Sequence, residues 1–155
     1  MSLVLTPAHL AAAFDHAAAT YPNECCGLIV GRTEGEDWIA ERLVPTRNMD
    51  TTGRNDRYVL HPQDRLKADE AARADGLAIV GFYHSHPDHG VYFSETDLKN
   101  SEEYQMGEPW LPPSYAYLIV SIYDKEPRDH GAFVVREGQS EPLPVRLLPG
   151  PEDAS

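Results

Sequence analysis

Two histidines that stand two residues apart, His84 and His86, have a spacing that suggests chemistry. In a β-strand, residues i and i+2 lie on one face, roughly 6.5–7 Å apart along the chain, so that both imidazoles can bind one metal ion. Asp97 follows, and a carboxylate delivered by the next element would complete a three-ligand set. Three protein ligands with a fourth position left for water are typical of catalytic zinc. The sequence therefore predicts a catalytic zinc site at His84, His86 and Asp97.

Ser94 precedes Asp97 by three residues, and this spacing has two interpretations. S-x-x-D is a helix capping box, in which Ser94 would be the N-cap and Asp97 would reach back to it. In a hydrolytic site, the Ser94 hydroxyl would instead donate a hydrogen bond to the oxyanion that forms on the substrate. The two interpretations are compatible, because a capped helix would present Asp97 to the metal. Ser85 falls on the opposite face of the strand, where we expect a structural hydrogen bond.

The segment that leads to the histidines is a nearly continuous apolar run, residues 77–83. Such a run is typical of a strand that is buried on both faces. A polar cluster at the point where a buried strand leaves the core indicates a functional site.

Glu24 lies far upstream, beside a second apolar segment at residues 25–31. A hydrolytic zinc site needs a general base for its water, and a glutamate at the mouth of a strand can supply one. The alternative is an ordinary solvated glutamate in a loop.

These residues form one pattern: Glu24, then His84-x-His86, seven residues, Ser94, two residues and Asp97. The pattern resembles the JAMM/MPN metalloprotease domain, and the five residues together are far more specific than any part of them.

The resemblance extends to the flanking segments and covers roughly residues 5–136. The matching segments are Glu24–Leu28, Val80–Pro87 and Tyr117–Ser121. The loop Asp88–Phe93 is bulkier than the small-residue loop often seen there, and this difference concerns substrate preference rather than metal binding.

The resemblance implies an α+β fold with a mixed, mainly antiparallel sheet flanked by helices, in a three-layer arrangement similar to cytidine deaminases. It implies a zinc-dependent metallopeptidase with Glu24 and Ser94 as catalytic residues. The expected substrate is an amide or isopeptide bond at the flexible C-terminal tail of a ubiquitin-like or sulfur-carrier protein. We expect one domain over residues 1–148 and a disordered tail at 149–155.

Composition excludes several other classes. A net charge of −12 argues against nucleic acid as a partner, because its binders need a basic face, although it allows a basic protein surface. No apolar run approaches the roughly 18 residues of a membrane span. Without a basic N-terminal signal region, the expected location is the cytoplasm. The two cysteines, Cys25 and Cys26, are adjacent and cannot join distant segments, so we expect reduced thiols, one of them in the core, rather than a disulfide, a nucleophile or a zinc ligand.

Local patterns predict more strands than helices, and several of the strands follow each other directly. Helices are expected at residues 8–20, 62–76 and 94–104. Strands are expected at residues 25–31, 37–45, 57–60, 77–84, 115–122, 131–136 and 143–148, with a charged turn at 124–130. The loops 47–57 and 104–114 would form the walls of a substrate cleft, where Tyr92 and Trp110 would contact the substrate or serve as ordinary loop anchors. His89 would be a solvated loop residue or touch substrate, and the remaining histidines are expected at the surface or at helix starts: His9, His16, His61 and His130.

Three other functions remain open. A non-enzymatic MPN scaffold would be expected to lack ligands that are present here. A zinc deaminase would carry H-x-E and P-C-x-x-C, and neither motif occurs. A small-molecule amidase or dipeptidase would use the same zinc site. The ligands also accept other divalent ions.

Overall fold

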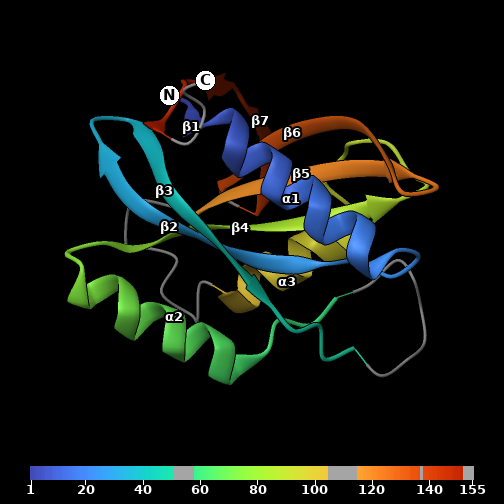
Figure 1. Ribbon diagram of the computed structural model, residues 1–155, viewed down its shortest axis with the longest axis horizontal. Coiled ribbons are helices and arrows are strands. Elements are labelled where there is room, and N and C mark those ends of the chain that lie inside the picture. The colour runs from blue at the N-terminus through green and yellow to red at the C-terminus, as the bar shows by residue number, and fades with distance from the viewer. Residues whose placement is uncertain (51–57, 105–114, 137, 152–155) are drawn as a thin grey trace.

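The computed structural model describes residues 1–50, 58–104, 115–136 and 138–151. Figure 1 shows its helices and strands in chain order. The helices are α1 (Pro7–Thr20), α2 (Pro62–Ala74) and α3 (Glu95–Tyr104). The strands are β1 (Leu3–Leu5), β2 (Cys26–Glu34), β3 (Asp37–Thr46), β4 (Ala78–Pro87), β5 (Ala116–Tyr123), β6 (Glu126–Arg136), β7 (Gln139–Leu143) and β8 (Val145–Leu147).

The described strands form one mixed sheet in the order β7-β6-β5-β4-β2-β3-β1-β8. Pairs β7–β6, β6–β5, β4–β2 and β2–β3 are antiparallel. Pairs β5–β4, β3–β1 and β1–β8 are parallel. The expected α+β fold with a mixed sheet flanked by helices is therefore confirmed.

The sheet is covered on both faces, as the three-layer expectation requires (Figure 1). On one face, α1 packs through Leu10, Ala13, Phe14 and Ala17 against alternate residues of the sheet, among them Ile29 and Leu118. On the other face, Ala68 of α2 and Leu98 of α3 pack with Leu28, Phe82 and Tyr117. The period-2 alternation of β-strands thus divides neighbouring residues between two apolar clusters.

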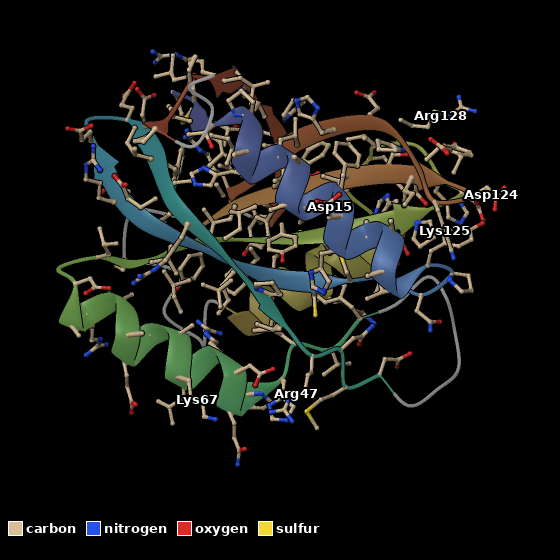
Figure 2. All side chains as sticks on the ribbon, in the orientation of Figure 1. Asp15, Arg47, Lys67, Asp124, Lys125 and Arg128 are labelled. Atoms are coloured by element: carbon tan, nitrogen blue, oxygen red, sulfur yellow. The ribbon has the colours of Figure 1, made fainter. Side chains whose placement is uncertain are left out.

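Each helix begins at a side-chain cap that supplies an acceptor to its unpaired N–H groups. In α1, the Thr6 hydroxyl accepts from the His9 N–H, and Pro7 stands at the first helical position. In α2, His61 Nδ1 accepts from the N–H groups of Gln63 and Asp64. Figure 2 shows Arg47 beside this end of α2, where its guanidinium pairs with Asp64 at 2.8 Å.

The two edges of the sheet meet. β7 and β8 lie at opposite ends of the strand order, yet Pro144 alone separates them in the chain. The Leu3 N–H donates to the Pro144 carbonyl at 2.9 Å, and Leu143 is buried in the cluster beneath α1. The chain therefore passes directly from one edge strand of the sheet to the other at Pro144.

Several expected elements differ from the structure. β1 and β7 were not expected, and the strand expected at 143–148 spans only Val145–Leu147. Instead of a strand at 57–60, the described residues form one isolated bridge, Asn48 with Leu60. The charged turn expected at 124–130 is short, because β6 begins at Glu126; Figure 2 shows Asp124 and Lys125 at its tip, and both have positive φ. The loop at 106–114 and residues 152–155 of the expected tail lie outside the described residues.

Gly81 marks a close approach of β4 to β5, because a Cβ there would overlap the backbone carbonyl of Ala116. We expect Gly81→Ala to lower the free energy of unfolding by about 1–3 kcal/mol, the usual cost of overpacking. Urea denaturation followed by circular dichroism measures this. Gly90→Ala is the control, because a Cβ there meets no atom within 4 Å. Equal unfolding midpoints for the two variants would contradict the prediction.

Candidate metal centre

The end of β4 presents the two histidines. The strand continues through the motif to Pro87, beyond the expected end at residue 84, because it pairs with β5 along this whole stretch: His84 lies opposite Ile119 and His86 opposite Ser121. His84 and His86 alternate with Tyr83 and Ser85, so the imidazoles share the face that carries α2 and α3. His84 is 1% exposed and stacks on Tyr58, with ring centroids 4.7 Å apart.

α3 presents the carboxylate. The capping box expected from the sequence is present, since the Asp97 N–H donates to Ser94 Oγ at 3.0 Å and the Ser94 N–H donates to Asp97 Oδ2 at 2.9 Å. The cap occupies Oδ2, while Oδ1 lies 3.0 Å from His84 Nε2. The same reciprocal bonds that begin the helix therefore aim one carboxylate oxygen at the histidines.

Three ligand atoms converge at this point. His84 Nε2 and His86 Nε2 are 3.3 Å apart, and His86 Nε2 is 3.2 Å from Asp97 Oδ2. Ligand atoms of the three residues all lie within 4.8 Å of one another, and among the described residues this is the group that could hold a metal ion. The structure thus brings together the three residues that the sequence spacing selected.

The hydrogen bond at His86 Nδ1, the ring nitrogen that faces away from Asp97, indicates whether these three residues can hold a metal ion. His86 Nδ1 lies 2.9 Å from the Gly90 carbonyl, which only accepts, so Nδ1 carries the proton and neutral Nε2 presents a lone pair. That lone pair faces the Asp97 carboxylate and the other imidazole. Electron-pair donors this close repel one another unless a proton or a metal ion lies among them. A divalent ion satisfies all three, and imidazole nitrogen with carboxylate oxygen is a zinc donor set.

Asp97 is held in its ionised form. Burial by itself raises the pKa of this carboxyl, but the adjacent His84, the close contacts with both imidazoles and the hydrogen bond from the Ser94 N–H together outweigh it. The net effect places the pKa of Asp97 well below its usual range, so a charged ligand is ready at neutral pH.

Glu24 lies at the mouth of β2, two residues before Cys26, which pairs with His84. Its side chain is 4% exposed, so it is not the solvated loop glutamate of the alternative interpretation. The three-residue ligand group within the described residues does not include it. Glu24 is therefore a buried acid at the start of the strand that pairs with the histidine-bearing β4.

Two further residues of the region had no signal in the sequence. Gly90 acts through its carbonyl, and Asn48 through its side-chain amide, which donates to the Glu24 carbonyl at 3.1 Å. Ser85, which was expected to make a structural hydrogen bond, accepts from the Cys25 N–H at 2.8 Å.

The expectations for the surrounding aromatic and histidine residues have different outcomes. Tyr92 is 50% exposed, and its ring centroid lies 5.0 Å from that of His86. His89 is exposed, and Trp110 lies outside the described residues. The expectation of a surface position for His16 is wrong: its Nδ1 lies 2.8 Å from the Tyr83 hydroxyl, and burial lowers the pKa of this imidazole.

Both thiols are inert by burial. Cys25 and Cys26 are 1% and 0% exposed, and burial, partly offset by side-chain hydrogen bonds, raises the pKa of each thiol to about 12. We expect iodoacetamide at pH 8 to modify neither cysteine in the folded protein, because only about one thiol in 10⁴ is ionised there, and to modify both after unfolding. Mass spectrometry of the alkylated protein checks this, and labelling of the native protein at the rate of a free thiol would contradict it.

A mixed sheet covered by helices on both faces, with a His-x-His strand that meets an aspartate at the start of a helix, is the arrangement expected of the JAMM/MPN class. The family model described as prokaryotic homologs of the JAB domain matches residues 6–134, and the chain belongs to this family.

Curated relatives agree with this assignment. The chain is 33% identical over 112 residues to a protein named desampylase of Haloferax volcanii, covering 72% of each chain. It is 30% identical over 134 residues to a protein named CysO-cysteine peptidase of Mycobacterium tuberculosis, covering 86% of this chain and 82% of the relative. Tail tip assembly protein K of Escherichia phage N15 is 37% identical, but the chain spans only 29% of its length.

The solved structures agree as well. A protein from Desulfitobacterium hafniense, known from a solution structure, has a TM-score of 0.79 to this chain at 27% identity, and the match covers 96% of this chain and 94% of the other. The two curated relatives named for peptide or conjugate cleavage are hydrolases, and this chain is a hydrolytic enzyme of the same family.

None of the described helices has the length and apolar character needed to cross a bilayer.

Proposed function

We propose that the protein is a zinc-dependent metallopeptidase that hydrolyses an amide or isopeptide bond at the C-terminal tail of a ubiquitin-like or sulfur-carrier protein. The observation that carries the proposal is the convergence of two imidazole nitrogens and one carboxylate oxygen, with a buried glutamate on the adjoining strand. We further propose that residues 1–148 act as a single domain, and that the enzyme works in the cytoplasm without a nucleic-acid or membrane partner.

His84 and His86 would hold the zinc ion through Nε2, and Asp97 would hold it through Oδ1, the oxygen that the helix cap does not use. When bound, zinc supplies Lewis acidity, which lowers the pKa of a water molecule towards about 7 and polarises a carbonyl group. The Gly90 carbonyl keeps the proton of His86 on Nδ1, and Tyr58 holds the ring of His84 by stacking.

Glu24 would act as the general base and acid. Its carboxylate takes a proton from the water that attacks the scissile carbonyl, and returns this proton to the leaving nitrogen. The Ser94 hydroxyl accepts from the Asp97 N–H, which leaves its own hydrogen for the carbonyl oxygen that becomes negatively charged. Ser94 thus combines the structural and catalytic roles that the sequence left open.

The relatives favour a protein tail as the substrate. A desampylase and a CysO-cysteine peptidase carry in their names a conjugate or a carrier adduct that each cleaves. An extended tail is also compatible with the half-exposed ring of Tyr92 beside His86, which would contact it. The acidic chain, with a net charge of −12, suits a carrier whose tail region is basic.

The proposal is tested with a sulfur-carrier protein extended beyond its C-terminal glycine. Cleavage is followed by mass spectrometry for the zinc-loaded enzyme, for the enzyme after chelation, and after zinc is restored. We expect cleavage after the glycine that is lost with chelation and regained with zinc. Zinc binding with turnover of small amides alone would indicate an amidase or dipeptidase, and a protein that binds no zinc would indicate an MPN scaffold.

A further inference from the structure

The peptide unit that joins Glu24 to Cys25 lies just outside the sheet. β2 begins at Cys26, so the ladder of backbone hydrogen bonds starts one residue later. Both polar groups of this peptide unit are nevertheless bonded, and in each case the partner is a side chain. The Glu24 carbonyl accepts from Asn48 Nδ2 at 3.1 Å, and the Cys25 N–H donates to Ser85 Oγ at 2.8 Å.

We propose that Ser85 and Asn48 are positioning residues, which fix the backbone of Glu24 relative to the metal-binding histidines and so set the place of its carboxylate. This inference rests on the proposed function, because it assigns Glu24 its general-base role. Neither side chain touches the reacting atoms; each acts through the peptide unit that carries Glu24.

Ser85 is suited to this role by its place in the chain. It stands between His84 and His86 on β4, and its side chain points to the opposite face of the sheet, fully buried. The Ser85 N–H also donates to the Cys25 carbonyl at 3.2 Å. The stretch His84–His86, which supplies two of the ligands, is therefore also hydrogen-bonded to Cys25, the residue next to Glu24. A shift of this stretch would move the backbone of Glu24 as well.

Asn48 is fixed in an orientation that leaves its amide nitrogen for Glu24. Its Oδ1 accepts from the N–H of Asp50 at 3.0 Å and from the N–H of Val59 at 2.8 Å. With the oxygen occupied by two backbone donors, the other side of the amide must be the nitrogen, and that nitrogen points at the Glu24 carbonyl. Asn48 thus links the backbone of Glu24 to two other segments, the one that follows β3 and the one that precedes α2.

The expected effect follows from the sensitivity of proton transfer to geometry. Loss of Ser85 Oγ leaves the Cys25 N–H buried without its acceptor, and the peptide unit must move to find another. A misplacement of about 1 Å in a catalytic group costs on the order of 10²-fold in rate. We expect Ser85→Ala to lower kcat by about 10- to 100-fold with KM changed by less than about twofold.

The experiment compares Ser85→Ala, Ser85→Thr and Asn48→Asp with the wild type, each with and without Glu24→Gln. Threonine keeps the hydroxyl and should restore most of kcat. Aspartate at position 48 keeps the oxygen that accepts from the N–H groups of Asp50 and Val59, but it lacks the amide N–H that donates to the Glu24 carbonyl. Asn48→Asp should therefore lower kcat and leave KM nearly unchanged. In the Glu24→Gln background, neither Ser85→Ala nor Asn48→Asp should lower the residual rate further, because the base that they position is absent.

Two readouts do not depend on activity. Zinc stoichiometry should stay at the wild-type value in all variants. Exchange of the Cys25 amide hydrogen, measured by NMR on the metal-free protein, should be about 10-fold faster or more in Ser85→Ala and unchanged in the exposed-serine control Ser140→Ala.

An unchanged kcat in Ser85→Ala, or an equal loss of rate in the Glu24→Gln background, would overturn the inference. If Ser85→Ala does not fold, Asn48→Asp at its half-exposed position decides the question by the same kinetic comparison. A wild type without zinc-dependent cleavage would instead refute the proposed function, and the amide exchange would still report on the hydrogen bond itself.

Discussion

Replacement of Glu24 by glutamine is expected to lower kcat for amide hydrolysis by about 10²- to 10⁴-fold, the usual contribution of a general base, while the protein still binds zinc. Glutamine has nearly the same shape and fits the same buried position, but it cannot take a proton from water. Glu24 is outside the three-residue ligand group, so metal affinity should not depend on its charge. Steady-state kinetics and metal analysis on the same preparation measure both quantities.

The matched control is Glu70→Gln, an exposed glutamate on α2, which should leave kcat unchanged. A Glu24→Gln protein that loses zinc would mean that Glu24 is a ligand rather than the base. A variant with both full zinc and full activity would remove Glu24 from the mechanism.

Asp97→Asn is expected to weaken zinc binding by more than about 100-fold, because it removes a ligand rather than a residue that only orients one. The substitution is selective, since the asparagine oxygen can still accept from the Ser94 N–H and preserve the helix cap. Its amide nitrogen then takes the place of Oδ1 beside His84, and an N–H group has no lone pair to give to a metal. Competition with a chromophoric chelator gives the affinity.

Glu95→Gln provides the control for this substitution, because it removes an exposed acid from the same first turn of α3 without touching the ligand cluster. It should bind zinc as the wild type does. Wild-type affinity in Asp97→Asn would rule out the carboxylate as a ligand, and a fall in both variants would point to an effect of helix charge.

The ligands could be predicted from the sequence because each depends on local geometry. His84 and His86 share a face in any strand, and S-x-x-D specifies how Asp97 is held at a helix start. The partners that refine the site, the Gly90 carbonyl and Asn48, could not be predicted, since each acts on a residue that only the folded chain brings near.

Strand β1 was missed for a related reason. It is three residues long and pairs with β8 across almost the whole chain, so it has no periodic pattern of its own. His16 was expected at the surface or at a helix start because it has no partner at ligand spacing in the sequence, yet its ring lies within hydrogen-bond distance of Tyr83 on β4.

The link between the two edge strands at Pro144 bears on how the chain acquires its structure. β1 has neighbours on both sides, β3 and β8, and Leu3 of β1 pairs with Val145 of β8. During translation, the Leu3–Leu5 segment therefore leaves the ribosome long before its outer partner exists. Contacts so distant in sequence carry a high loop-closure entropy and slow the search for the native pairing. We expect the β1–β8 ladder to form late, after α1 has collapsed onto the central strands.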